Sequence, residues 1–173
     1  MNEVKLITDR LVIDAVRPCD KADYFHNISH DKRVLETFIC NYAETLEEFD
    51  FSKYPGREDL FAVRKKEDGR LIGILTYFDV KDGACEIGYG FGSEHWGKGY
   101  ATEAVSAFLD YCVDTLGLQK VYASFFVGNT ASERVMQKCG MHYSHTNEKE
   151  LTYLGIERDL IYYVIKRSDE KQI

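Results

Sequence analysis

The stretch HWGKGYATEA, from His95 to Ala104, places two glycines and a lysine directly before a predicted helix. A helix N-terminus presents backbone N–H groups without intrahelical partners and a partial positive charge, which together favour an anion, above all a phosphate. Gly97 and Gly99 carry no side chain, so the backbone there can approach such an anion closely. The pattern therefore indicates a phosphate-binding loop, with a glycine turn that holds no ligand as the alternative.

Two known phosphate motifs fit this stretch only incompletely. Residues 92–98 match the GxxxxGK part of a nucleotide-binding P-loop, but Gly99 follows where a Ser or Thr would bind magnesium. The dinucleotide pattern GxGxxG fails because Thr102 stands where its last glycine belongs. That fold would also need a parallel βαβ unit here, whereas the chain before the loop is typical of hairpins. A P-loop nucleotide hydrolase stays an alternative that Gly99 argues against.

The elements that position the loop can be predicted from periodicity and turn signals. Asp68-Gly69 and Asp82-Gly83 are typical of tight hairpin turns between strands. Apolar residues keep helical spacing up to Gly117, and residues 130–133 predict a capping box at the start of a second helix. We expect strands over 10–16, 60–65, 71–80, 84–92, 120–127 and 160–165, and helices over 20–30, 100–116 and 130–140.

The aromatic and acidic stretch from Tyr42 to Tyr54 allows two interpretations. It is consistent with a surface that receives a cationic amine, but an ordinary amphipathic helix is the interpretation that we favour. His26 and His30 are four residues apart, yet no Glu completes a zinc-binding motif beside them. We therefore expect no metal site.

Composition limits the class of protein. The length of 173 residues fits a single domain, and the net charge of −7 argues against general nucleic-acid binding. No apolar run approaches the ~18–20 residues of a membrane-spanning helix, and the opening stretch MNEVKLITDR lacks the apolar segment of a signal peptide. The five cysteines are scattered without a close pair. We therefore expect a cytoplasmic protein with reduced thiols and no membrane partner.

Four stretches, in this order along the chain, resemble the GNAT superfamily of acyl-CoA-dependent N-acetyltransferases. They are ITDRLVI (Ile7 to Ile13), CEIGYGF (Cys85 to Phe91), WGKGYATEA and NTASERVMQKCGM (Asn129 to Met141). Their form is typical of the ribosomal-protein-alanine N-acetyltransferase-like (RimJ/RimL-like) branch. Trp96 departs from the Gln or Arg that opens the general signature. This departure matters little if backbone amides bind the ligand.

The resemblance implies a fold and a cofactor site. The fold would be mixed α/β (α+β), with a mostly antiparallel sheet of about seven strands, flanked by helices and splayed at the acetyl-CoA site. The loop amides would hold the pyrophosphate of acetyl-CoA, and a backbone N–H at the end of the preceding strand would polarise the thioester carbonyl. The implied cofactor-binding residues are Gly90, Phe91, Trp96, Gly97, Lys98, Gly99, Tyr100, Ala101, Thr102, Asn129 and Ser132.

The catalytic groups are less well specified. Glu86 shares a strand face with two glycines at period-two spacing, so it is the leading candidate for the base that accepts the amine proton. The alternative is that Glu86 pairs with a basic neighbour or only orients the substrate. Glu150 is the second candidate base. Many family members carry a tyrosine acid where this chain has Met136, and in the resembling branch Ser132 can take over, although helix capping would also explain a serine there.

We therefore expect an acetyltransferase that moves an acetyl group from acetyl-CoA to a primary amine by direct transfer in a ternary complex. The acceptor would be a protein N-terminus or a small-molecule amine, and the sequence contains no motif that chooses between them. A non-catalytic acyl-CoA-binding regulatory module is the alternative, because Met136 replaces the usual acid. Homodimers are common in the resembling branch, but nothing in the sequence specifies an interface.

Overall fold

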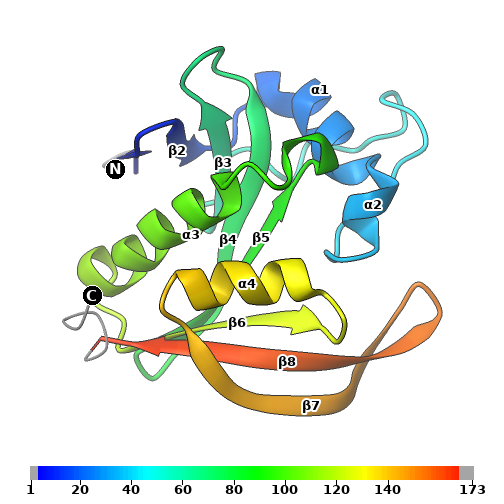
Figure 1. Ribbon diagram of the computed structural model, residues 1–173. Helices are drawn as coiled ribbons and strands as arrows, with labels where there is room; N and C mark the ends of the chain where they lie inside the picture. Colours follow the sequence, from blue (N-terminus) through cyan, green and yellow to red (C-terminus); the bar gives the residue numbers. More distant parts are fainter. Residues whose placement is uncertain (1–3, 168–173) are drawn as a thin grey trace. The chain divides into compact units, whose positions relative to one another are not determined.

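The computed structural model describes residues 4–167 (Figure 1). Strands in the described chain form one mixed sheet in the order β1-β2-β3-β4-β5-β6-β8-β7. The pairs β1–β2, β2–β3, β3–β4, β6–β8 and β7–β8 are antiparallel, and β5 and β6 are parallel. The strands are β1 (Leu6–Ile7), β2 (Leu11–Ala15), β3 (Leu60–Lys65), β4 (Leu71–Lys81), β5 (Ala84–Phe91), β6 (Lys120–Phe126), β7 (His142–Tyr153) and β8 (Ile156–Lys166).

Two α-helices precede strands β3, β4 and β5 in the sequence, and two follow them. The α-helices are α1 (Lys21–Tyr24), α2 (Lys32–Leu35), α3 (Tyr100–Asp110) and α4 (Thr130–Lys138). Short 3₁₀ turns occupy η1 (Pro18–Asp20) and η3 (Ser93–His95), and π-helical turns occupy η2 (Phe25–Ser29) and η4 (Tyr111–Thr115). The expected mixed α/β fold, with a mostly antiparallel sheet flanked by helices, is confirmed. The described chain divides into two compact units.

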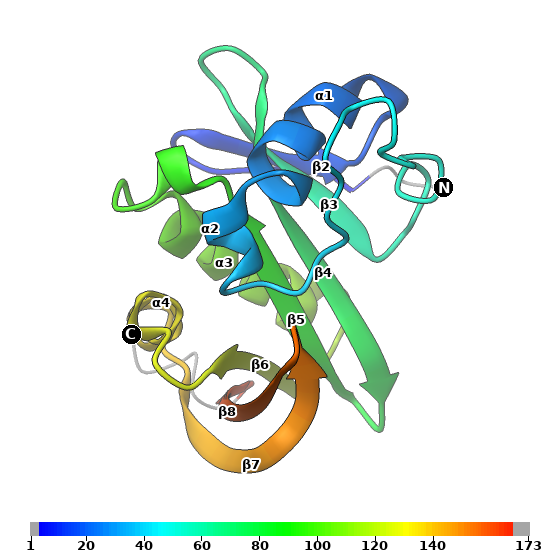
Figure 2. The same cartoon turned by 90° about the vertical axis from the view of Figure 1, so that its right-hand side faces the viewer.

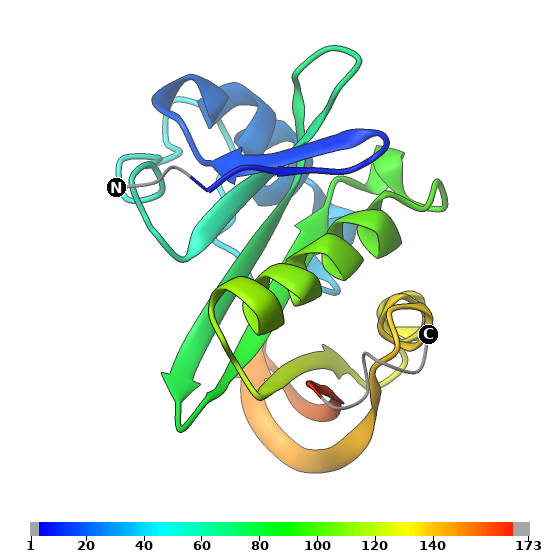
Figure 3. The same ribbon diagram turned by 90° about the vertical axis from the view of Figure 1, so that its left-hand side faces the viewer.

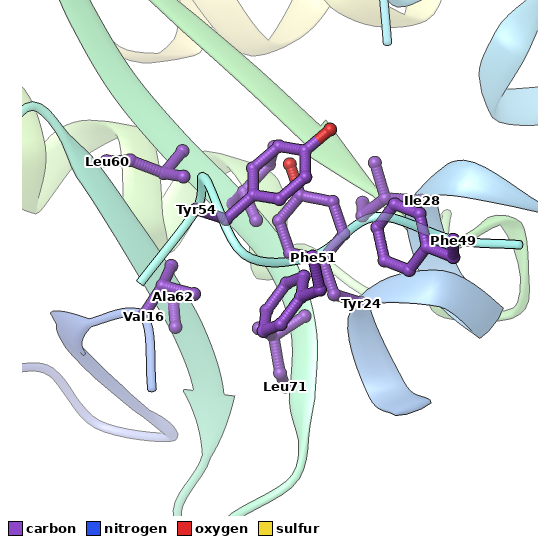
Figure 4. Packing of buried hydrophobic residues seen from close by; sticks show 10 residues of the cluster. Val16, Tyr24, Ile28, Phe49, Phe51, Tyr54, Leu60, Ala62 and Leu71 are labelled. Carbon is purple, nitrogen blue, oxygen red and sulfur yellow. The ribbon is translucent and has the colours of Figure 1, made fainter. Parts of the chain in front are cut away.

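The first unit comprises the chain up to Thr76 together with Tyr89–Ala107. Figure 2 shows α1 and α2 beside strands β2 and β3. The core of this unit includes an aromatic cluster in which Tyr24 of α1 contacts three other rings, with centroids 4.7–5.9 Å apart (Figure 4). Burial of each such ring contributes about 1.5–3 kcal/mol to the stability of the fold. The rings that surround Tyr24 are Phe49, Phe51 and Tyr54.

These contacts correct one expectation. The stretch from Tyr42 to Tyr54 is not an amphipathic helix, because turns and irregular backbone occupy it. Its aromatic side chains at 49, 51 and 54 are buried in the cluster, whereas Tyr42 is exposed. The physical reason is tertiary packing. The three rings pack against α1 and β3, and the backbone that carries them is irregular because it follows this packing.

The second unit comprises Tyr77–Gly88 and the chain from Phe108 onward. In this unit β7 and β8 form a long hairpin, and α4, yellow in Figure 3, lies inside the curve of the strands. The hydroxyl of Tyr163 on β8 donates to Glu133 at 2.8 Å and accepts from Gln137 at 3.3 Å, which ties α4 to the strand. The sequence did not delimit β7, because its residues are mostly polar and exposed.

Two further expectations about local structure are wrong. The helix α4 is capped by Asn129, whose side-chain oxygen accepts from the Ser132 N–H at 3.2 Å, so the predicted capping box at 130–133 does not form. The strands β5 and β6 pair in parallel, from Ala84 with Lys120 to Ile87 with Ala123, and α3 connects them in sequence. A parallel crossover therefore does follow the hairpins, but it is the one parallel pairing assigned among the described strands.

Candidate functional site

The glycine loop lies between η3 and α3, where the sequence placed it. Gly97 and Gly99 have φ values of +72° and +80°, a backbone region that favours glycine. A Cβ at position 97 would meet nothing within 4 Å, and one at position 99 would meet only the Arg10 guanidinium, at 3.3 Å. Both glycines are therefore required by backbone conformation, and the space beside Gly97 is open to a ligand.

The first turn of α3 directs its N–H groups toward this loop. The N–H of Glu103 donates to the carbonyl of Gly99 at 3.1 Å. Helix geometry leaves the N–H groups that precede such a bond without acceptors inside the helix. Two of these N–H groups belong to Tyr100 and Ala101, which are among the predicted cofactor-binding residues. The arrangement matches an anion site at a helix N-terminus.

Arg10 holds the loop from the outside. Its guanidinium donates to the carbonyl of Lys98 at 2.9 Å, forms an ion pair with Glu103 at 2.8 Å and lies 4.5 Å from the ring centre of Tyr100. Three contacts from one side chain restrict the loop and the first turn of α3 together. The loop is thus organised before any ligand arrives, which lowers the entropy cost of binding.

Trp96 explains how the chain manages without the usual Gln or Arg. Its indole N–H donates to the carbonyl of Phe91 at 2.7 Å, which fastens the loop to the end of β5. The guanidinium of Arg33 lies 5.0 Å from the centre of the Trp96 ring, within cation–π range. Trp96 therefore anchors the backbone, and its ring also holds the positive charge of Arg33 beside the loop.

Cationic side chains lie close to the loop although the protein as a whole carries a net charge of −7. The pKa of His95 is lowered, first by burial and then by repulsion from Lys98, Lys65 and Arg70, while Glu94 opposes the lowering. Cations near a helix N-terminus add to its attraction for an anion, which supports a phosphate site at the loop.

The end of β5 is closely packed. A Cβ at Gly90 would lie 2.9 Å from the ring of Phe38, and a Cβ at Gly73 would lie 2.5 Å from the ring of Phe91. Both glycines are therefore needed for close approach. The predicted roles of Gly90 and the Phe91 N–H at the thioester remain predictions.

Glu86, the leading candidate base, lies on the part of β5 that belongs to the second unit. Its carboxylate accepts a hydrogen bond from the hydroxyl of Ser124 on β6 at 2.6 Å. The pKa of Glu86 is raised, mainly by burial and further by the negative charges of Asp79 and Glu150, while the Ser124 hydrogen bond opposes the rise. No ion pair involving Glu86 is present among residues 4–167, so within that range it does not pair with a basic side chain.

The two other carboxylates come from distorted stretches of strand. Asp79 has a φ of +53° within β4. Glu150 follows Lys149, whose φ is +49°, where the register of β7 shifts against β8. Bulges and strained residues of this kind re-aim side chains and are common near functional sites. Glu150, the second candidate base, is thus an electrostatic neighbour of Glu86.

The start of α4 holds the remaining predicted residues. Asn129 uses its side-chain oxygen as the helix cap, so a role toward the cofactor would fall to its amide nitrogen or its backbone. Ser132 lies in the first turn of α4, and its N–H donates to that cap. Met136 is fully buried and has no proton to donate. Ser132 remains the candidate acid.

Ser124 and Tyr162 were not singled out from the sequence. Period-two alternation puts Ser124 on the same face as Tyr122, but only the strand pairings bring it beside Glu86.

Within the described chain no group of three or more His, Cys, Asp or Glu side chains is arranged to hold a metal ion. His30 instead contacts the carbonyl of Ala43 through Nδ1 at 3.0 Å and stacks on Phe25. In the same part of the chain no helix is long and apolar enough to cross a membrane.

Known proteins share both the sequence pattern and the fold. The family model described as "Acetyltransferase (GNAT) domain" matches residues 10–142. YkkB, an uncharacterized protein of Bacillus subtilis (strain 168), is 32% identical over 156 residues, which cover 85% of this chain and 90% of YkkB. The [ribosomal protein uS5]-alanine N-acetyltransferase of Escherichia coli (strain K12) is 24% identical over 180 residues, covering 96% of this chain and 93% of that protein.

A solved structure agrees. The crystal structure of a GNAT-family acetyltransferase from Bacillus anthracis superimposes with a TM-score of 0.85 at 27% identity, covering 95% of this chain and 99% of that one. The glycine loop, Glu86 and the start of α3 all fall within the residues that the family model matches. The chain therefore belongs to the GNAT acetyltransferase family, and its relatives fit the ribosomal-protein-alanine N-acetyltransferase-like branch.

Proposed function

We propose that this protein transfers an acetyl group from acetyl-CoA to a primary amine by direct attack in a ternary complex, and that residues 1–173 act as a single N-acetyltransferase domain. The observation that carries the proposal is the loop of Gly97 and Gly99, held in left-handed backbone conformations at the N-terminus of α3. A pyrophosphate is the group that such a loop beside cationic side chains binds well. Membership of the GNAT family supports acetyl-CoA as the molecule that carries it.

In the proposed reaction, Glu86 accepts a proton from the acceptor ammonium, directly or through a water. The free amine then attacks the thioester carbonyl carbon, and the carbonyl electrons move to the oxygen, which the N–H of Phe91 stabilises. The intermediate collapses to the amide as its nitrogen releases a second proton to solvent, and it expels the CoA thiolate. The thiolate takes a proton from solvent, directly or through the hydroxyl of Ser132, which donates its own proton and regains one from water. A carboxylate whose pKa is raised suits the first step, because a base is most effective when its pKa approaches the working pH.

The acceptor class has two candidates. The E. coli relative is named for an alanine of ribosomal protein uS5, which supports a protein N-terminus. The carboxylates of Asp79, Glu86 and Glu150 attract any protonated amine, so a small-molecule amine fits equally. A cytoplasmic location and a homodimer also remain predictions.

The test has two stages. Thermal-shift titration with acetyl-CoA, CoA, ATP and NAD comes first, because a ligand that binds only the folded state stabilises it by about 2.7 kcal/mol at a hundred-fold excess over its dissociation constant. We expect a rise in melting temperature with the CoA species and none with NAD or ATP. No rise with CoA would overturn the proposal.

Turnover is then measured with a panel of peptides with free N-termini and of small-molecule amines. Acetylated product is detected by mass spectrometry, because the exposed thiol of Cys19 would react with a thiol reagent for free CoA. Binding of acetyl-CoA without acetylation of any amine would favour the second candidate, a non-catalytic acyl-CoA-binding regulatory module. The buried Met136 at the usual acid position is the observation that favours it.

A further inference from the structure

A polar row crosses four neighbouring strands in the second unit. Ser124 on β6 lies opposite Tyr162 on β8, and Tyr162 lies opposite His145 on β7. Glu86 on β5 is paired with Tyr122, two residues before Ser124, so its side chain shares the face of Ser124. The strand order β5-β6-β8-β7 therefore places Glu86 at one end of the row and His145 at the other.

The members of this row contact one another in sequence. The Ser124 hydroxyl donates to Glu86 at 2.6 Å, and Ser124 is the cross-strand neighbour of Tyr162. The ring of Tyr162 stacks on His145 with centroids 4.5 Å apart and planes 5° from parallel. This stacking restricts the tyrosine ring, and hence the direction in which its hydroxyl points.

Hydrogen counting fixes the direction of the bond between Ser124 and Glu86. An ionised carboxylate only accepts, so the single hydrogen of Ser124 goes to Glu86. Tyr162, on the neighbouring strand, keeps its proton because burial, with further contributions from Glu86, Glu150 and Asp79, raises the pKa of Tyr162 to about 12. It therefore adds no negative charge beside Glu86.

We propose that Ser124 is a positioning residue that orients the carboxylate of Glu86 and holds it ionised for proton abstraction. The inference rests on the proposed function, since it needs Glu86 to act as the base. The ionisable groups that face Glu86 from neighbouring strands are Asp79, Glu150 and Tyr162, and the two carboxylates disfavour a further negative charge. The Ser124 hydrogen bond is the contact that opposes them.

The experiment compares pH profiles of kcat/KM for acetyl transfer. Ser124→Ala removes the donor, so the pKa of Glu86 rises and the acidic limb of the profile moves to higher pH. At neutral pH we expect kcat to fall roughly tenfold, because the variant loses one hydrogen bond to a charged group. The dissociation constant of acetyl-CoA should stay unchanged. Ser124→Thr keeps the hydroxyl and should restore the profile.

A second measurement does not depend on turnover. Carboxyl ¹³C NMR titration follows Glu86 directly, with its resonance assigned by its absence in Glu86→Gln. We expect the midpoint to rise in Ser124→Ala and to stay in place in Ser144→Ala, which removes a hydroxyl that contacts His145 instead. An unmoved midpoint in Ser124→Ala overturns the inference.

The failures of the two proposals are distinguishable. If Glu86→Gln acetylates at the wild-type rate, the proposed base is wrong and the inference falls with it. If Glu86→Gln is inactive while Ser124→Ala keeps the wild-type pH profile and titration midpoint, only the inference is wrong. If the wild type transfers no acetyl group, the proposed function fails, and the inference falls with it because it needs Glu86 to act as a base.

Discussion

The glycine loop and the carboxylate row are built in opposite ways. The loop is one contiguous stretch whose glycines, lysine and helix start are adjacent in the sequence, and the charges that act on His95 beside it are mostly positive. The row takes one side chain from each of four strands, and the charges that act on Glu86 are all negative. The first region suits an anion and the second a cation, and they must serve different reactants.

This difference decides how each region tolerates substitution. The loop works through backbone groups, so it depends on φ and ψ and not on the identity of most side chains, which is why Trp96 can replace a Gln or Arg. The row works through side-chain atoms, so a single functional group matters. Variants of the row should therefore change chemistry, and variants of the loop should change binding.

The largest expected effect lies in the row. Glu86→Gln keeps the size of the side chain but removes the base, so kcat should fall by about 10²- to 10⁴-fold, the usual contribution of general base catalysis. The dissociation constant of acetyl-CoA, measured by titration calorimetry, should change little.

Glu150→Gln is the matched control, because Glu150 acts on Glu86 only through its charge. Its removal should lower the pKa of Glu86 and shift the acidic limb of the pH profile to lower pH. A larger kcat loss in Glu150→Gln than in Glu86→Gln would reverse the two assignments.

The next effect tests the loop by itself. Gly97→Ala forces an alanine into a φ of +72°, at a cost of about 1–3 kcal/mol, and the loop should relax away from its binding conformation. Binding of acetyl-CoA should weaken by roughly tenfold, since each tenfold corresponds to about 1.4 kcal/mol.

Gly117 offers a close control for this variant. It has a φ of +70°, and a Cβ there would also meet nothing within 4 Å. Gly117→Ala should lower the free energy of unfolding by a similar amount and leave the dissociation constant of acetyl-CoA unchanged. Equal losses of affinity in both variants would mean that strain alone, and not the loop, explains the effect.

The same contrast explains how much the sequence could predict. The loop, the hairpin turns at Asp68-Gly69 and Asp82-Gly83, and the helix from Tyr100 depend on residues close in the chain, and their signals were correct. The helical spacing of apolar residues did not predict the π-helical turn at the end of that helix.

Features that depend on distant residues were missed or wrong. Phe51 and Tyr54 have a spacing that also fits a helix, but their packing against Tyr24 leaves the backbone irregular. The contact of Ser124 with Glu86 requires the parallel register of β5 and β6, which period-two alternation cannot supply. Alternation predicts the face of a side chain, whereas register decides its neighbour.

The smallest expected effect concerns Asp31, a carboxylate in the region of the glycine loop. Asp31 caps α2 by accepting from the N–H groups of Arg33 and Val34, at 3.0 and 3.4 Å, and its second oxygen accepts from the N–H of Ser93 at 2.7 Å. Asp31 thus ties α2 to the turn that precedes the loop. Burial raises the pKa of Asp31, but these hydrogen bonds outweigh it and the pKa is lowered overall.

Asp31→Asn turns one acceptor into a donor that faces the Ser93 N–H, so the free energy of unfolding should fall by about 1–2 kcal/mol at neutral pH. A carboxyl whose pKa is lowered by folding stabilises the protein above its unfolded pKa, and this contribution is lost as the pH falls through the folded value. Urea unfolding should therefore show a difference between wild type and variant that is full at neutral pH and shrinks on acidification. Asp50→Asn is the control, because the hydrogen bonds of Asp50 stay within its own turn at Ser52. A difference that persists unchanged in acid would mean that the charge of Asp31 contributes nothing, and the loop region would then differ from the carboxylate row in needing only neutral acceptors.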